Sequence, residues 1–233
     1  MSRMQETLCE GLPRLGLELD EGRQRQLCAF GEAVIRQNEV MNLTAITEPD
    51  QVAKLHLLDS LSLLTLAELS GKRMIDVGCG AGFPGVPVKI ACPGVRLTLL
   101  DSLGKRMNWL EQILPQLNVE AECVTARAEE FVQTRREQYD IATSRAVARL
   151  NVLLELTAAY VKPGGLVLAM KGAAAREELE EAKNAISRLG LKLEKVVEFP
   201  MDGTAHAVIV LRKVAHTPPQ YPRRYSKIKQ APL

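Results

Sequence analysis

The stretch that decides the fold is Met74-Ile75-Asp76-Val77-Gly78-Cys79-Gly80-Ala81-Gly82-Phe83-Pro84-Gly85, in which a short apolar run leads directly into glycines at alternate positions. Glycine tolerates positive φ and has no Cβ, so the chain can turn tightly and leave bare backbone for a ligand. The run followed by Gly78, Gly80 and Gly82 therefore predicts a nucleotide-binding turn at the carboxyl end of a strand. Taken alone, the glycines fit a purely structural turn equally well.

The spacing of the glycines indicates which nucleotide is bound. Dinucleotide dehydrogenases use Gly-x-Gly-x-x-Gly, whose third glycine packs the helix against the strand. Here Gly82 comes one position early and Phe83 stands where that pattern needs Gly or Ala. The loop instead resembles the Asp/Glu-x-Gly-x-Gly-x-Gly loop of S-adenosylmethionine-dependent methyltransferases. An NAD-dependent oxidoreductase is the rival class, and Phe83 argues against it.

An acidic residue ends the next apolar run. Residues 97–101 read Leu-Thr-Leu-Leu-Asp, and Asp101 follows Gly78 by 23 positions. A second parallel strand delivers a carboxylate to ribose hydroxyls at such a place. We therefore predict that Asp101 binds ribose. Capping of the helix that follows is the alternative role.

Composition is that of a globular protein, with 46% hydrophobic and 25% charged residues among 233. No apolar run reaches the roughly 18 residues of a membrane span, and the polar first residues do not resemble a signal peptide. We expect a soluble, cytoplasmic monomer that associates with no membrane and binds no metal. The five cysteines are scattered, so we expect reduced thiols. Cys79 lies inside the glycine loop, but no histidine is near it in sequence, which favours a space-filling role over a nucleophilic one.

Hydrophobic periodicity divides the chain into three parts. Residues 1–70 read as a helical extension, with Asp20 capping one helix and Thr47 opening another. Residues 71–213 alternate strands and helices, as in an α/β, Rossmann-like methyltransferase domain with a parallel sheet. We expect strands near 73–77, 96–100, 121–125, 139–143, 165–170, 193–199 and 206–212, and helices near 84–91, 103–117, 149–161 and 175–189. Residues 200–204 predict a hairpin that adds an antiparallel strand at the end of the sheet.

Residues 214–233 form a basic, proline-rich tail. No acid follows Asp202, so residues 1–202 carry a net charge of −4 and the remainder +6. Such a segment cannot form a core but can follow a phosphate backbone, with Tyr221 or Tyr225 available to stack. The predicted RNA contacts are Arg223, Arg224, Lys227 and Lys229. We expect the tail to supply no cofactor ligand; a disordered, solubilising end is the alternative.

Several motifs together resemble one family, the RsmG (GidB) enzymes, which are bacterial 16S ribosomal RNA guanine-N7 methyltransferases. The matching stretches lie between residues 42 and 172: Asn42-Leu43-Thr44, Ile46-Thr47, His56 with Asp59-Ser60-Leu61, the 76–85 loop, Asp101-Ser102-Leu103, Lys105-Arg106, Arg127-Ala128-Glu129, Ser144-Arg145-Ala146 and Lys171-Gly172. The basic tail is also similar.

The resemblance implies a methyl transfer from S-adenosylmethionine to guanine N7 of 16S ribosomal RNA, free or in the small ribosomal subunit. It also implies the cofactor-binding residues, which are Gly78, Gly80, Gly82, Phe83, Asp101, Ala128, Glu129 and Arg145. Glu129 as a surface acid and Arg145 as an ordinary strand-end residue are the alternatives.

The resemblance leaves the catalytic residues unknown. His56, Asp59 and Ser60 have the spacing of one helix face, which invites a catalytic interpretation. We favour a structural or RNA-contacting role, because guanine N7 carries a lone pair and no proton and so needs no base. Two further rivals remain: a methyltransferase for a small molecule or protein, and an RNA-binding protein with an inactive cofactor site.

Overall fold

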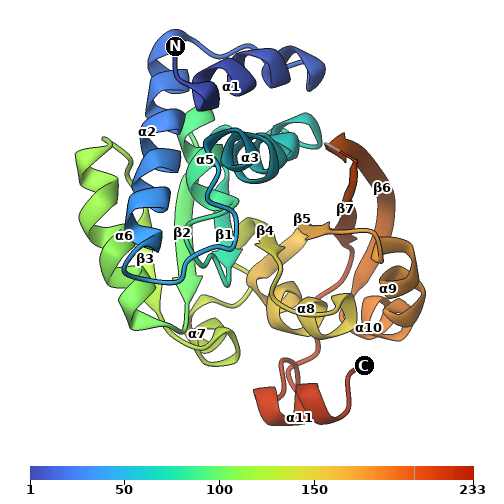
Figure 1. The fold of residues 1–233 in the computed structure, drawn as a ribbon. Coiled ribbons are helices and arrows are strands. Elements are labelled where there is room, and N and C mark those ends of the chain that lie inside the picture. The colour runs from blue at the N-terminus through green and yellow to red at the C-terminus, as the bar shows by residue number, and fades with distance from the viewer. Residues whose placement is uncertain (202) are drawn as a thin grey trace.

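The computed structural model describes residues 1–201 and 203–233, and its centre is a seven-stranded sheet in the order β3-β2-β1-β4-β5-β7-β6 (Figure 1). The strands are β1 (Arg73–Val77), β2 (Arg96–Asp101), β3 (Glu122–Thr125), β4 (Tyr139–Arg145), β5 (Val161–Lys171), β6 (Leu191–Met201) and β7 (Thr204–Lys213). Strands β1 to β5 pair in parallel, whereas β7 is antiparallel to both of its neighbours. The predicted Rossmann-like α/β fold is confirmed.

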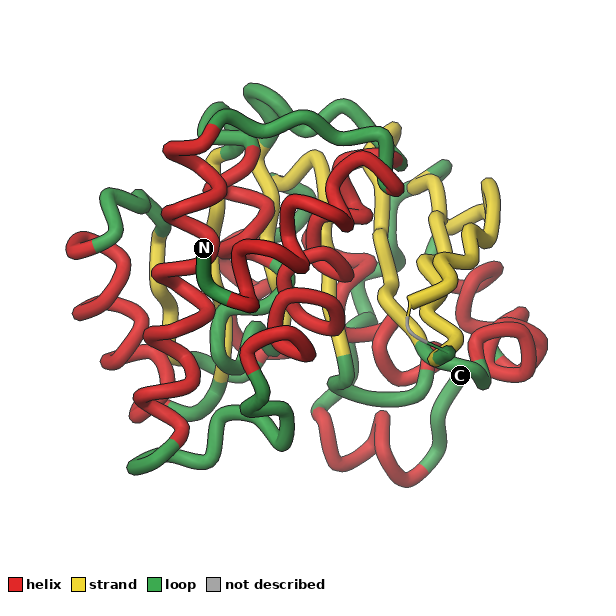
Figure 2. Tube along the Cα trace, turned by 45° about the horizontal axis from the view of Figure 1, so that its top comes forward, coloured by secondary structure: helices red, strands yellow, loops and turns green. Residues whose placement is uncertain are grey.

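Helices cover both faces of the sheet, which is why its inner strands read as continuous apolar runs (Figure 2). The connecting helices are α5 (Gly85–Ala91), α6 (Gly104–Gln116), α7 (Ala128–Arg135), α8 (Leu150–Thr157), α9 (Ala175–Glu181) and α10 (Lys183–Arg188). Buried side chains of α5 and α6 belong to one core, and those of α7, α8 and α10 to the other. No helix was predicted over α7, and a single helix over 175–189 was predicted where the structure has α9 and α10.

The N-terminal helices extend the first of these two cores. They are α1 (Arg3–Arg14), α2 (Glu21–Asn38), α3 (Pro49–Val52), a π-helix (Ala53–Leu58), α4 (Asp59–Leu61) and a 3₁₀ turn (Ser62–Thr65). As predicted, Asp20 caps α2 by accepting the Arg23 N–H at 2.9 Å. The helix that we expected to open at Thr47 has Glu48 as its N-cap and widens into the π-helix after one turn. A π-helix shifts side chains relative to α-helical spacing and is frequent at functional sites.

The position of the last strand corrects the prediction of an antiparallel strand at the end of the sheet. Strand β7 lies between β5 and β6, so β6 is the edge strand. The reason is hydrophobicity: β7 carries the buried run 207–211, whereas β6 exposes residues 192–195. The expected hairpin turn includes Asp202, which lies outside the described residues.

The C-terminal tail packs against the body of the protein, contrary to the prediction that it stays outside the core. Tyr221 and Ile228 are buried, and the tail ends in helix α11 (Tyr225–Gln230), at the bottom of Figure 1. The Arg136 guanidinium donates to the carbonyls of Thr217 and Tyr221 at 2.9 Å. The net charge of the tail did not predict this docking, because the residues that hold the tail lie far away in the sequence.

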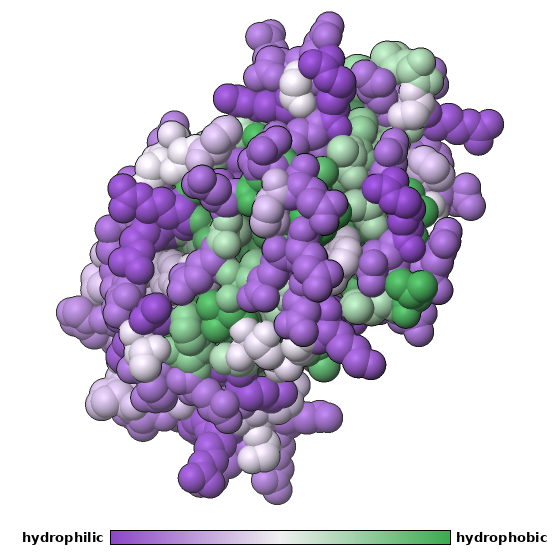
Figure 3. Space-filling view, turned by 90° about the vertical axis from the view of Figure 1, so that its left-hand side faces the viewer, coloured by the Kyte–Doolittle hydropathy of each residue, from purple (hydrophilic) through white to green (hydrophobic). Residues whose placement is uncertain are grey.

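One side of the molecule, formed by α2 and α6, mixes apolar side chains in its middle with hydrophilic ones around them (Figure 3). Among residues 1–201 and 203–233, no helix combines the length and apolar character needed to cross a membrane.

Candidate active site

Two cavities open at the carboxyl ends of the parallel strands, where α/β sheets bind ligands. The larger has a volume of about 840 Å³ and the smaller about 330 Å³. They share the lining residues Gly78, Arg106, Ala146 and Val147, so they adjoin at the first glycine of the loop.

The three loop glycines have different surroundings. Gly78 lines both cavities and Gly80 lines the larger one. Gly80 has φ +57°, and a Cβ added there would have only Arg106 Nη1 nearby, at 3.9 Å. Gly82, with φ +96°, faces the core instead, and an added Cβ would lie 2.8 Å from a methyl of Val86. Gly82 lines neither cavity, so it shapes the turn rather than touching their contents.

Asp101 connects the end of β2 to the glycine loop. Its Oδ2 accepts the Gly80 N–H at 3.0 Å and its Oδ1 accepts the Leu103 N–H at 2.9 Å. The helix-capping alternative is wrong, because the N-cap of α6 is Leu103. Asp101 lines the smaller cavity, and a carboxylate has lone pairs for further donors.

Ala128 and Glu129 also line the smaller cavity, at the start of α7. The Tyr160 hydroxyl donates to the Ala128 carbonyl at 2.6 Å, and Arg127 Nε lies 3.2 Å from a carboxylate oxygen of Glu129. These contacts fix the backbone of the first turn of α7 beside Asp101.

Asp76, which opens the glycine motif, is fully buried beneath the loop and lines neither cavity. Its Oδ2 accepts the Gly85 N–H at 2.8 Å, and its Oδ1 has no hydrogen-bond partner within the part of the chain that the structure describes. Complete burial raises the pKa of Asp76 to about 7. A buried, unsatisfied oxygen is costly, so Asp76 has capacity for one more donor beneath the loop.

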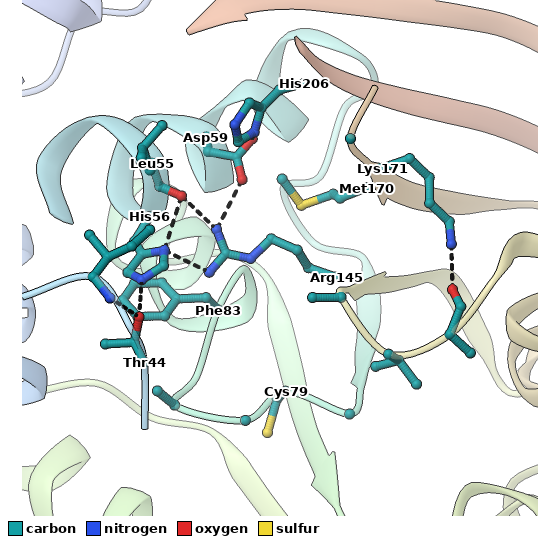
Figure 4. Close-up of a pocket in the computed structure, with 18 of the residues that line it drawn as sticks. Thr44, Leu55, His56, Asp59, Cys79, Phe83, Arg145, Met170, Lys171 and His206 are labelled. Atoms are coloured by element: carbon teal, nitrogen blue, oxygen red, sulfur yellow. Dashed lines mark hydrogen bonds and ion pairs between the residues drawn. The ribbon is translucent and has the colours of Figure 1, made fainter. Parts of the chain in front are cut away.

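Arg145 dominates the wall of the larger cavity (Figure 4). Its Nη1 donates to Asp59 Oδ2 and to the Leu55 carbonyl, both at 2.9 Å. Its Nη2 lies 3.1 Å from His56 Nδ1, and its guanidinium lies 5.2 Å from the ring centre of Phe83. The π-helix thus supplies Leu55 and His56, and α4 supplies Asp59, to one arginine at the end of β4.

The two histidines of this cavity are held in different ways. His56 Nε2 lies 2.7 Å from Thr44 Oγ1, and its ring lies 4.7 Å from that of Phe83. Burial, assisted by the Arg145 charge, lowers the pKa of His56 to about 4. The hydrogen bond from His206 Nδ1 to Asp59, at 2.9 Å, raises the pKa of His206.

Ser60 and Cys79, both weighed in the sequence analysis, are buried. Ser60 is fully buried and donates to the His56 carbonyl, so it does not share the cavity face with His56 and Asp59. Burial raises the pKa of the Cys79 thiol well above its ordinary value, which keeps it protonated and supports the space-filling role.

In the tail, Arg223 differs from the other predicted RNA contacts. Its Nη2 lies 2.6 Å from Glu155 Oε2, and Glu155 is fully buried. This pairing neutralises the Arg223 charge, and the RNA contact of Arg223 stays a prediction. Arg224, Lys227 and Lys229 are exposed, and none of their side chains has a hydrogen bond or ion pair within the described residues.

Two solved structures illustrate the likeness in fold. The mitomycin 7-O-methyltransferase MmcR aligns with a TM-score of 0.57 at 17% identity, over 79% of this chain and 60% of that chain. The Pyrococcus horikoshii TYW2 structure in complex with MeSAdo aligns with a TM-score of 0.55 at 15% identity, over 67% of this chain and 62% of that chain. At these identities the likeness concerns the fold alone.

The fold, the glycine loop and the carboxylate after β2, in a chain whose relatives are named methyltransferases, define an S-adenosylmethionine-dependent methyltransferase. The family model for rRNA small subunit methyltransferase G (GidB) matches residues 23–206. The chain therefore belongs to the rRNA small subunit methyltransferase G family, as the motifs predicted.

Relatives named ribosomal RNA small subunit methyltransferase G match nearly the whole chain. The Alkaliphilus metalliredigens (strain QYMF) protein is 42% identical over 232 residues, which cover 97% of both chains. The Desulfitobacterium hafniense (strain Y51) protein is 42% identical over 225 residues, covering 94% of this chain and 93% of that protein.

Proposed function

We propose that this protein transfers a methyl group from S-adenosylmethionine to N7 of a guanine in 16S ribosomal RNA. The observation that carries the proposal is the pair of adjoining cavities in a chain of this family. One cavity is lined by the carboxylate of Asp101 and the other by Phe83, His56 and Arg145.

The residues present fit the cofactor. In this proposal Asp101 accepts hydrogen bonds from the ribose hydroxyls in the smaller cavity. The backbone of Ala128 and Glu129 contacts adenine there. Gly80 leaves space in the larger cavity for the methionine end, whereas the absence of a Cβ at Gly78 makes room for the Val147 side chain. S-adenosylmethionine supplies an electrophilic methyl group when bound.

The larger cavity is suited to a neutral base. Because Asp59 neutralises Arg145, this pair adds no net charge that would repel the cation formed when guanine is methylated at N7. Phe83 and His56 provide flat surfaces at the same wall. The protein's contribution is orientation of the base and exclusion of water.

A general base is not needed, so the rate is expected to show no histidine titration near neutrality. Both nitrogens of His56 already have partners, and its pKa of about 4 keeps it neutral. Single-turnover methyl transfer should vary little between about pH 6 and 8.5, where an ordinary histidine base with a pKa of about 6.5 would give a slope. His56→Gln should lower the rate without changing the shape of the profile. A tenfold rise per pH unit that disappears in the variant would contradict this mechanism.

Asp101→Ala tests the cofactor placement. We expect it to weaken binding of S-adenosylhomocysteine by about 1.5–3 kcal/mol, the value of hydrogen bonds to a charged group. Calorimetry gives the affinity, and thermal unfolding of the free variant reports the separate cost of losing the Gly80 and Leu103 contacts. Unchanged affinity would restrict Asp101 to holding the loop.

We also propose that the tail contacts the RNA backbone through Arg224, Lys227 and Lys229. These bases are exposed and lie together on or beside one short helix, α11. Each phosphate contact releases a counterion and adds about 0.7–0.9 to the dependence of log affinity on log salt.

Small ribosomal subunits from cells lacking this protein test the function. Purified enzyme with labelled S-adenosylmethionine should label their 16S RNA, and mass analysis of nuclease digests should find 7-methylguanosine. Subunits from unmodified cells serve as the control, because their site is already methylated. Label in protein or small molecules, with none in RNA, would favour the rival methyltransferase class.

A further inference from the structure

The C-terminal tail reaches the smaller cavity, which sequence analysis did not anticipate. Tyr225, the first residue of α11, lines this cavity together with Asp101, Ala128 and Glu129. The Arg127 guanidinium lies 4.4 Å from the centre of the Tyr225 ring. Since Arg127 also contacts Glu129, the tail joins the wall where we place adenine.

The tail is held in this position by contacts on both sides of Tyr225. Before it, Arg223 pairs with the buried carboxylate of Glu155 through its backbone N–H at 2.9 Å, its Nε at 2.8 Å and its Nη2 at 2.6 Å. After it, Ile228 is fully buried. Arg136 binds the carbonyls further upstream. Tyr225 is thus a fixed part of the cavity wall.

From this arrangement we propose that the C-terminal segment is part of the cofactor site, with Tyr225 closing its adenine end. The inference rests on the proposed placement of adenosine beside Asp101, Ala128 and Glu129. An aromatic ring stabilises a purine by contact with its face or edge, and Arg127 fixes the Tyr225 ring from one side.

This geometry couples cofactor binding to docking of the tail, because a ligand that contacts the docked tail stabilises the docked state. By linkage, cofactor binding strengthens tail docking by the same factor as docking strengthens cofactor binding. The tail therefore links two events in one enzyme: its exposed bases face RNA, while Tyr225 faces the cofactor.

Calorimetry with S-adenosylhomocysteine tests the proposal without requiring activity. Tyr225→Ala should weaken binding about tenfold, or about 1.4 kcal/mol, because the contact between the ring and the base is lost. Tyr225→Phe should bind within about twofold of the unaltered protein, since the ring is retained. Arg223→Ala, which removes the side-chain bonds to Glu155 that hold the tail, should also weaken binding. Gln230→Ala, an exposed change in the same helix, is the matched control.

Limited digestion with trypsin gives a second readout. Cleavage after Arg224 and Lys227 should slow when S-adenosylhomocysteine is added to the unaltered protein, and the protection should disappear in Tyr225→Ala. Full affinity in Tyr225→Ala, with Asp101→Ala weakened, would overturn the tail inference and leave the cofactor placement intact. Full affinity in both variants would overturn the placement itself.

Discussion

Replacing Asp59 with alanine is expected to lower the free energy of unfolding by about 3–5 kcal/mol, one of the two largest effects that the structure predicts. The Asp59 side chain is 4% exposed and that of Arg145 18%, so the change leaves a nearly buried guanidinium without its counter-charge. It also removes the partner of His206. Urea unfolding followed by circular dichroism measures the loss.

A double variant separates the cost of an unpaired charge from the loss of packing. Asp59→Leu combined with Arg145→Leu should recover most of the stability, because replacing a buried pair by apolar residues is often neutral. Methyl transfer should nevertheless be lost, since the wall of the larger cavity no longer orients the base. A double variant as unstable as Asp59→Ala would show that the other partners of Arg145, above all the Leu55 carbonyl, are decisive.

Alanine at Gly80 and at Gly82 should give opposite phenotypes. At Gly82 the new Cβ would meet Val86 and lie 3.1 Å from Leu110 in a left-handed backbone, so we expect a loss of about 3 kcal/mol of stability. At Gly80 the methyl group enters the larger cavity, and the backbone strain costs about 1–2 kcal/mol. We expect Gly80→Ala to remain folded while its affinity for S-adenosylhomocysteine falls about tenfold or more.

Thermal unfolding and calorimetry on the two variants check this division. Gly82→Ala should be assayed at low temperature, where enough of it stays folded to bind. If the two changes weaken binding and stability alike, the loop acts as one rigid unit, and no single glycine is specific to the cofactor.

Local patterns predicted much of the fold because they depend on neighbouring residues. Strand β1 follows its prediction to the residue, and Asp20 caps α2 as expected. The order of β6 and β7 does not follow from their order in the chain: the continuous apolar run 207–211 gives β7 the buried position beside β5, and the more polar β6 takes the edge. Helix α7 was missed because its eight residues bury little beyond Val132.

The parts of the site that lie within a short sequence motif could be predicted. The parts that depend on tertiary contacts could not. Asp101, Ala128 and Glu129 meet in one cavity as the family resemblance implied, although their binding role stays a prediction. The contact of Arg145 with the π-helix joins residues about 90 positions apart. The sequence neighbours of Arg223 do not indicate its ion pair with Glu155. Arg223 was therefore predicted to contact RNA in the same way as the other bases of the tail.

The insertion of β7 between β5 and β6 has a consequence for synthesis on the ribosome. Edge strand β6 joins the sheet only through β7, although it is made first. A growing chain therefore presents β6 and the open edge of β5 until residues 204–213 have left the exit tunnel. Tyr225 follows β7 in the chain, so the sheet can be complete before Tyr225 docks beside Asp101.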